Sequence, residues 1–171
     1  MTIAVFACGL LSVPGFHFAF SAGLSILIFL TLWFVLYRGL EADDSYQMEP
    51  KGRSFEPLLA HYFDVAKVVI SLAVGSIALL AGYIGFVLQG RPDLLSTVQR
   101  AIAWPLPLLA FGVIYAVLFL ASLAWSYESY LHFPESYTGF WYSLNQALGF
   151  SGLTCFALGY LALAISVVLI L

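Results

Sequence analysis

Four long runs of apolar residues make up most of the chain, and their length restricts what it folds into. They cover approximately residues 16–37, 68–88, 101–125 and 141–171. The hydrocarbon core of a bilayer is about 30 Å thick, and a helix of about 20 apolar residues spans it. Only helices and closed barrels satisfy every backbone hydrogen bond in lipid, and barrel strands alternate in polarity over about 10 residues. The uninterrupted runs therefore predict an all-α integral membrane protein, a bundle of four transmembrane helices.

The composition leaves little material for a water-soluble domain. Of the 171 residues, 63% are hydrophobic and 9% are charged, whereas a soluble domain carries about 25% charged residues. The net charge is −3, and no basic patch of the kind that binds phosphate is present, so no nucleic-acid partner is expected. We therefore expect residues 1–171 to form a single membrane domain in contact with the lipid bilayer.

The first apolar run is longer than one bilayer crossing needs. It extends back to residue 3, and a helix from there to residue 37 would be roughly 50 Å long. A proline removes a backbone hydrogen bond and clashes with the preceding turn, so we expect the helix to be broken or kinked near Pro14-Gly15. The last run has a similar excess, and Gly149 and Gly152 mark the place where we expect it to bend.

The second helix is expected to begin before its apolar run. Ser54 is suited to cap it, and Glu56 and Pro57 are suited to its first turn. The preceding polar loop, residues 38–54, is too short to form a domain. An amphipathic entry segment at the membrane surface is therefore predicted.

Four spans fix which loops share a side of the membrane. The 38–67 region and the 126–138 loop lie on one side, called face A, and the 89–100 loop lies on the other, called face B. Lys and Arg number four on face A and two on face B: Arg38, Lys51, Arg53 and Lys67 against Arg91 and Arg100. The positive-inside rule therefore favours face A as cytoplasmic. Aromatic residues also concentrate near face A, among them Trp33, Tyr37, Trp125, Tyr127, Tyr130 and Trp141.

Polar side chains gather at the face A ends of three predicted helices. They are His61, Asp64, Lys67, Glu128, His132, Glu135, Asn145 and Gln146. One interpretation places them at headgroup depth, solvated by water, and a second makes them interhelical hydrogen-bond partners, Asn145 and Gln146 especially. A third makes them a site for an ion, a proton or a polar ligand.

Within that cluster, Glu128 and His132 lie four residues apart and so share one helical face. His61 or Asp64 would complete a set of metal ligands with them. This spacing is common by chance, so neither a metal nor any other cofactor is predicted.

Small residues form a stripe along the second span at a spacing of three or four residues: Ser71, Gly75, Ala78, Gly82 and Gly85. The fourth span contains Gly149, Gly152 and Gly159. Small residues let another helix approach the backbone closely. Either the two sets pack inside the protomer, or they form an interface with another copy or a partner.

The sequence contains no phosphate-binding loop, nucleophile elbow, HExxH or CxxC motif, so enzymatic activity is not expected. The preferred interpretation is a small integral membrane subunit or scaffold that acts through assembly in a homo- or hetero-oligomeric complex. One alternative is an oligomeric ion-conducting pore or membrane-permeabilising effector. A second alternative is a membrane enzyme or metal site near Glu128 and His132.

Overall fold

The computed structural model of the chain describes residues 14–39, 55–90, 102–133 and 137–170, and for residues 14–17, 83–84, 86–90 and 167–170 it describes the backbone alone. These ranges contain four long helices: α2 (Pro14–Arg38), α3 (Glu56–Gly90), α5 (Pro105–His132) and α6 (Gly139–Ile170). All four are long and apolar enough to cross a membrane. The prediction of an all-helical chain with four helices of spanning length is confirmed.

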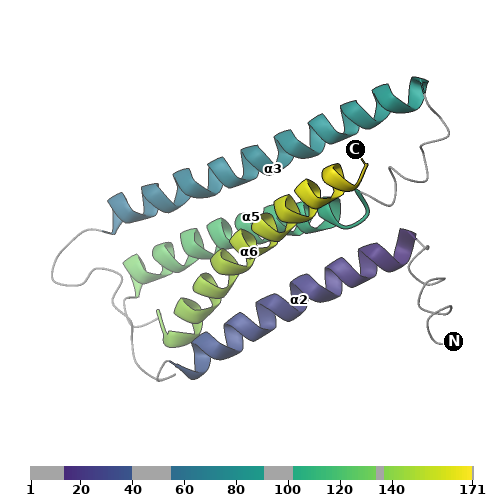
Figure 1. Cartoon of the computed structure of the whole chain (residues 1–171). Coiled ribbons are helices and arrows are strands. Elements are labelled where there is room, and N and C mark those ends of the chain that lie inside the picture. The colour runs from purple at the N-terminus through teal and green to yellow at the C-terminus, as the bar shows by residue number, and fades with distance from the viewer. Residues whose placement is uncertain (1–13, 40–54, 91–101, 134–136, 171) are drawn as a thin grey trace, which may run out of the picture.

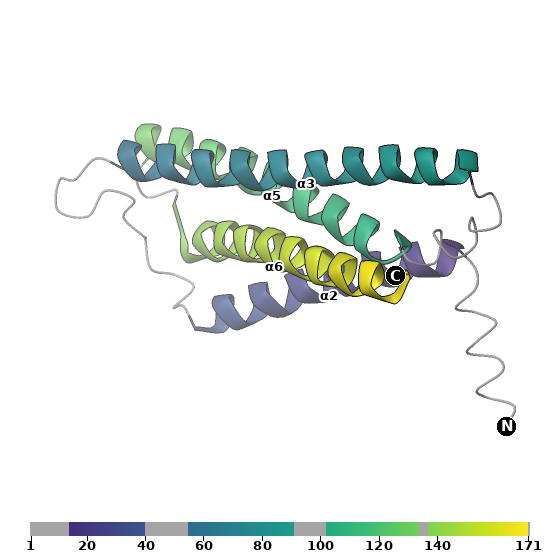
Figure 2. The same ribbon diagram turned by 45° about the horizontal axis from the view of Figure 1, so that its top comes forward.

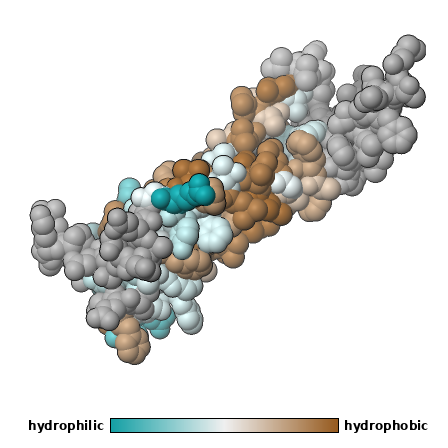
Figure 3. Space-filling view, turned by 90° about the horizontal axis from the view of Figure 1, so that it is seen from below, coloured by the Kyte–Doolittle hydropathy of each residue, from teal (hydrophilic) through white to brown (hydrophobic). Residues whose placement is uncertain are grey.

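The four helices lie side by side and alternate in direction (Figures 1 and 2). The C-terminal ends of α2 and α5 meet the N-terminal ends of α3 and α6 at one end of the bundle, which corresponds to the predicted face A (Figure 1). In Figure 3 the hydrophilic residues gather toward this end, while hydrophobic residues cover the middle of the bundle. Which compartment the face A end meets stays a prediction.

A proline opens α5, as its fixed φ and missing N–H favour. The described part of α2 begins at Pro14. Residues 1–13 lie outside the described residues, so the break near Pro14-Gly15 stays a prediction. Helix α5 begins at Pro105 after the N-cap residue Trp104, and it continues to His132, past the predicted end at residue 125.

Helix α3 begins at Glu56, and the Leu59 amide donates to the Phe55 carbonyl at 2.9 Å. The predicted cap, Ser54, lies outside the described residues. At 35 residues, α3 is about 50 Å long, which leaves room for the predicted entry segment.

Helix α6 starts at Gly139 and continues as one helix through Gly149 and Gly152. The last span is therefore not broken at these glycines, and the bend expected there stays a prediction. Gly152 instead serves close packing, because its backbone lies against Ala116 and Gly112 of α5.

The centre of the bundle is the pair α5 and α6, which pack along most of their length. Helix α2 packs mainly against α6, and α3 packs against α5 but hardly touches α6. A row of buried small residues at four-residue spacing faces inward on α6: Ser143, Ala147, Ser151, Cys155 and Gly159. Ser21 and Ser25 of α2 are fully buried as well. Small side chains therefore bring these backbones close together.

Candidate functional site

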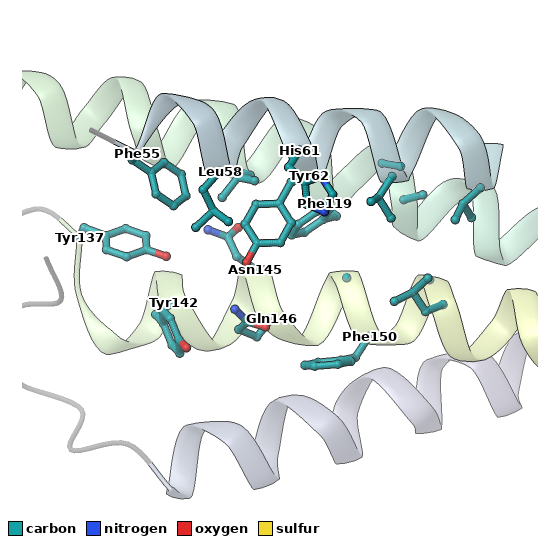
Figure 4. A pocket seen from close by; sticks show the side chains of 18 residues that line it. Phe55, Leu58, His61, Tyr62, Phe119, Tyr137, Tyr142, Asn145, Gln146 and Phe150 are labelled. Atoms are coloured by element: carbon teal, nitrogen blue, oxygen red, sulfur yellow. The ribbon is translucent and has the colours of Figure 1, made fainter. Parts of the chain in front are cut away.

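A pocket opens between α3 and α6 because α3 packs on α5 and stands away from α6. Its volume is about 550 Å³, within the range of about 300–1,000 Å³ that small-molecule sites occupy. Figure 4 shows side chains entering it from both helices. The floor is formed by α5, through Ala116, Phe119 and Leu123.

Polarity changes along the pocket. The half near face A holds the polar and phenolic side chains, which are His61, Tyr62, Tyr137, Tyr142, Asn145 and Gln146. The deeper half is apolar and is lined by Val65, Ala66, Val69, Ala116, Phe150 and Leu153. Helical spacing produces this order, because residues three or four apart on α3 and α6 return to the same face one turn deeper.

Asn145 joins α6 to α5 beside the pocket. It is 2% exposed, its Oδ1 accepts from the Ser122 hydroxyl at 2.6 Å, and its Nδ2 donates to the Ser126 hydroxyl at 3.1 Å. Both ends of the amide are therefore paired, as a buried polar group requires. For Asn145 the structure therefore agrees with the second interpretation of the polar cluster, in which its members are interhelical hydrogen-bond partners.

Tyr137 lies just before α6 and closes the face A end of the pocket (Figure 4). Burial raises the pKa of its phenol to about 12, and a hydrogen bond with the Asn145 side chain acts in the opposite direction. The phenol therefore stays neutral at physiological pH.

Tyr160 of α6 lies beyond the deep end of the pocket. Its hydroxyl donates to the Leu72 carbonyl of α3 at 3.0 Å, and it also hydrogen-bonds with the Ser76 hydroxyl. These bonds connect α3 directly to α6, which otherwise scarcely touch. The groove between the two helices therefore ends there.

The predicted polar cluster is only partly brought together. His61, Asn145 and Gln146 line the pocket. Within the described part of the chain, the Gln146 amide has no hydrogen-bond partner. Glu128 and His132 are exposed near the end of α5, and Glu135 lies outside the described residues.

Asp64 and Lys67 lie on the outer face of α3, with 3.7 Å between Lys67 Nζ and Asp64 Oδ1, and their side chains are 74% and 69% exposed. Three and six residues after His61, they are rotated away from it by about 60° and 120°. The exposure of these two charges agrees with the interpretation that places them in water, and not with a site that joins them to His61. Among the described residues, no group of three or more His, Cys, Asp or Glu side chains is placed to hold a metal ion.

The small-residue stripe of α3 also faces outward. All five of its residues are exposed: Ser71, Gly75, Ala78, Gly82 and Gly85. A Cβ atom built on any of its three glycines would meet nothing within 4 Å. The interpretation in which this stripe packs inside the protomer is therefore wrong, whereas Gly149, Gly152 and Gly159 of α6 do pack inside.

Two features of the site were not predicted from the sequence. The inward row on α6 has a readable signal, since Ser143, Ala147, Ser151, Cys155 and Gly159 recur every four residues. The aromatic residues that line the pocket, which are Phe55, Tyr62, Phe119, Tyr137, Tyr142 and Phe150, recur at no fixed spacing in the sequence. Comparison of the chain with family models, curated proteins and solved structures finds no match.

Proposed function

We propose that this chain is a multi-pass integral membrane protein that acts through assembly, as a subunit or scaffold in a homo- or hetero-oligomeric complex. The four apolar helices support the membrane location. The observation that carries the assembly role is the uncovered small-residue stripe on α3. A transmembrane helix of another copy or of a partner subunit is its proposed occupant.

The stripe lies opposite the face by which α3 joins its own bundle. At about 100° per residue, the five stripe residues fall within about 40° of one direction. The buried residues Ala66, Val69 and Ala73 fall on the opposite side of the same helix. Helix α3 therefore has one face for its own protomer and one for another helix.

The packing of α5 against α6 inside the bundle shows that small residues allow two helices to approach closely. Gly112 and Gly152 let α5 and α6 approach until their backbones touch. The stripe carries the same residue types on a face that no described residue covers. Van der Waals packing of this kind drives helix association in lipid, where the hydrophobic effect contributes little.

The ion pair of Asp64 and Lys67 extends the stripe toward face A, since both residues fall on the same side of α3. A partner helix would thus meet small residues along its buried length and a charged pair at its end. Such a pair contributes little to affinity but fixes the register of the two helices.

The test is the mass of the complex in a mild detergent or nanodisc, with every co-purifying chain identified. We expect the wild-type complex to be larger than one chain and the Gly75→Leu/Gly82→Leu variant to run as a single chain. Gly23→Leu is the matched control, because Gly23 of α2 is also exposed with nothing within 4 Å of a Cβ. A wild-type protein that is monomeric and brings no other membrane protein with it would overturn the proposal.

The same preparation separates the assembly role from the other functions predicted from the sequence. A pore requires the oligomer and also ion flux in liposomes. A metal enzyme requires bound metal that is lost in His132→Ala. Both stay predictions.

A further inference from the structure

We propose that the pocket between α3 and α6 binds one uncharged amphiphile, with a hydroxyl- or carbonyl-bearing head near face A and a single hydrocarbon tail in the deeper half. The site goes beyond the assembly role, because it faces α6 and lies on a different side of α3 from the small-residue stripe. The two proposals therefore stand or fall separately.

The size of the pocket limits the ligand. Its volume is about 550 Å³, and a water-sized group takes roughly 30 Å³, so it holds roughly 18 such groups. Along α6 the lining extends from Tyr142 to Leu153, a rise of about 16 Å. These dimensions suit one hydrocarbon chain with a small head.

The lining selects against a charged head. Among the described residues that line the pocket, none is Asp, Glu, Lys or Arg. A phosphate or carboxylate would lose its hydration there without gaining an opposite charge, which is costly. A neutral hydroxyl or carbonyl group avoids that cost.

Gln146 is the residue best placed to hold the head. An amide offers both donors and acceptors, so Gln146 can pair with a hydroxyl or a carbonyl oxygen. Its neighbour Asn145 already uses both ends of its amide on Ser122 and Ser126. His61 and Tyr62 face the same space from α3 (Figure 4).

The tail reaches the deeper half from the side. The apolar lining residues Leu58, Val65, Phe150 and Leu153 are 42–49% exposed, so the pocket is open along the gap between α3 and α6. In the proposed membrane location this gap faces lipid. A tail can therefore enter laterally while its head stays near the membrane surface.

A partner helix does not fit this pocket. A helix with its side chains is about 10–12 Å wide, and it would have to run the whole length of the groove. The hydrogen bond from Tyr160 to the Leu72 carbonyl joins α3 to α6 beyond Leu153 and Val69 and blocks that path. A short hydrocarbon tail that ends on the face A side of Tyr160 does not meet this hydrogen bond.

The test is titration of the full chain with monocaprin, an uncharged amphiphile with one short tail, in nanodiscs of dioleoylphosphatidylcholine, which contain no uncharged single-chain amphiphile. Native mass spectrometry reads the binding, and we expect one monocaprin to be retained per chain. Decanoate and decanoyl lysophosphatidylglycerol carry the same tail on a charged head, and we expect them to bind at least tenfold more weakly.

Two pairs of variants locate the site. Val65→Trp and Leu153→Trp fill the pocket and should weaken monocaprin binding at least tenfold. Val68→Trp and Leu161→Trp are matched controls on the same helices, since neither residue lines the pocket, and they should change the affinity less than twofold. Gln146→Leu should weaken monocaprin binding about tenfold without filling the pocket, so it tests the site even where a tryptophan variant does not fold.

Equal binding of all three amphiphiles, or of all variants, would identify ordinary lipid at the protein surface and overturn the proposal. A change in the mass of the complex for Leu153→Trp with unchanged monocaprin binding would identify a helix contact and also overturn the proposal. The Gly75→Leu/Gly82→Leu variant should retain monocaprin, so a failure of the assembly proposal can be distinguished from a failure of the amphiphile site.

Discussion

Gly112 of α5 and Gly152 of α6 face each other where the two helices cross. A Cβ atom on Gly112 would lie 3.3 Å from the Gly152 carbonyl oxygen and 3.2 Å from the Phe156 nitrogen. A Cβ atom on Gly152 would lie 3.3 Å from the Ala116 nitrogen. All three neighbours are backbone atoms, so neither helix has a flexible side chain that can move aside.

We therefore expect Gly112→Ala and Gly152→Ala to lower the free energy of unfolding by about 1–3 kcal/mol, the usual range for overpacking. Unfolding in detergent micelles, followed by circular dichroism, measures the change. Gly23→Ala is the control, because a Cβ atom there meets nothing within 4 Å. Equal stability of all three variants would show that α5 and α6 do not cross at this pair.

Asn145 provides the second prediction. Replacing it by leucine removes two interhelical hydrogen bonds and leaves the Ser122 and Ser126 hydroxyl groups without that partner. Interhelical hydrogen bonds in membranes are each worth about 0.6 kcal/mol on average and at most about 1.7. We expect Asn145→Leu to lower the free energy of unfolding by about 1–2 kcal/mol.

The adjacent amide is the matched control for Asn145→Leu. Gln146 has no hydrogen-bond partner in the described part of the chain, so Gln146→Leu should change the stability by less than about 0.5 kcal/mol. A double-mutant cycle of Asn145→Leu with Ser122→Ala should show coupling of about 0.6 kcal/mol. Independent, additive effects would contradict the hydrogen bond between these two side chains.

The number and approximate position of the helices could be predicted from the sequence, because bilayer thickness sets the length of each apolar run. The helix ends are less predictable, as shown by α5, which continues to His132. The interior of a membrane bundle and its lipid surroundings are both apolar. Hydrophobicity therefore does not tell which face of α5 or α6 points inward.

The candidate site could likewise be predicted only in part from the sequence. One interpretation joined Asp64 and Lys67 with His61 in a single site, but the rotation of α3 turns them outward. That rotation is set by how Ala66, Val69 and Ala73 fit against the bundle, and steric fit of this kind has no simple sequence signal. Asn145 was easier to predict as an interhelical hydrogen-bond partner, because a buried amide in an apolar helix has to find a donor or acceptor to pair with.

Replacing Tyr160 tests whether the hydrogen bonds of its hydroxyl group hold α3 against α6. Tyr160→Phe removes the bond to the Leu72 carbonyl and the contact with the Ser76 hydroxyl while leaving the ring in place. We expect a loss of about 1 kcal/mol and faster amide hydrogen exchange in α3, because its direct connection to α6 is lost. Ser166→Ala is the control, since the Ser166 hydroxyl donates within α6, to the Ala162 carbonyl, and to no other helix in the described part of the chain. Unchanged exchange in α3 would contradict this role.

Tyr137 gives a prediction about pH. Its side chain is 6% exposed, and burial raises the pKa of the phenol from 10.0 to about 12, against the opposing effect of the hydrogen bond with Asn145. The folded chain therefore favours the protonated phenol. This stabilisation is complete below pH 10 and is lost as the pH rises toward 12. Since one pKa unit corresponds to about 1.4 kcal/mol, wild type should lose about 1.4 kcal/mol more than Tyr137→Phe between pH 9 and pH 11. Unfolding midpoints of the two proteins across that range measure the difference, and parallel curves would show that Tyr137 ionises as readily in the folded chain as in the unfolded one.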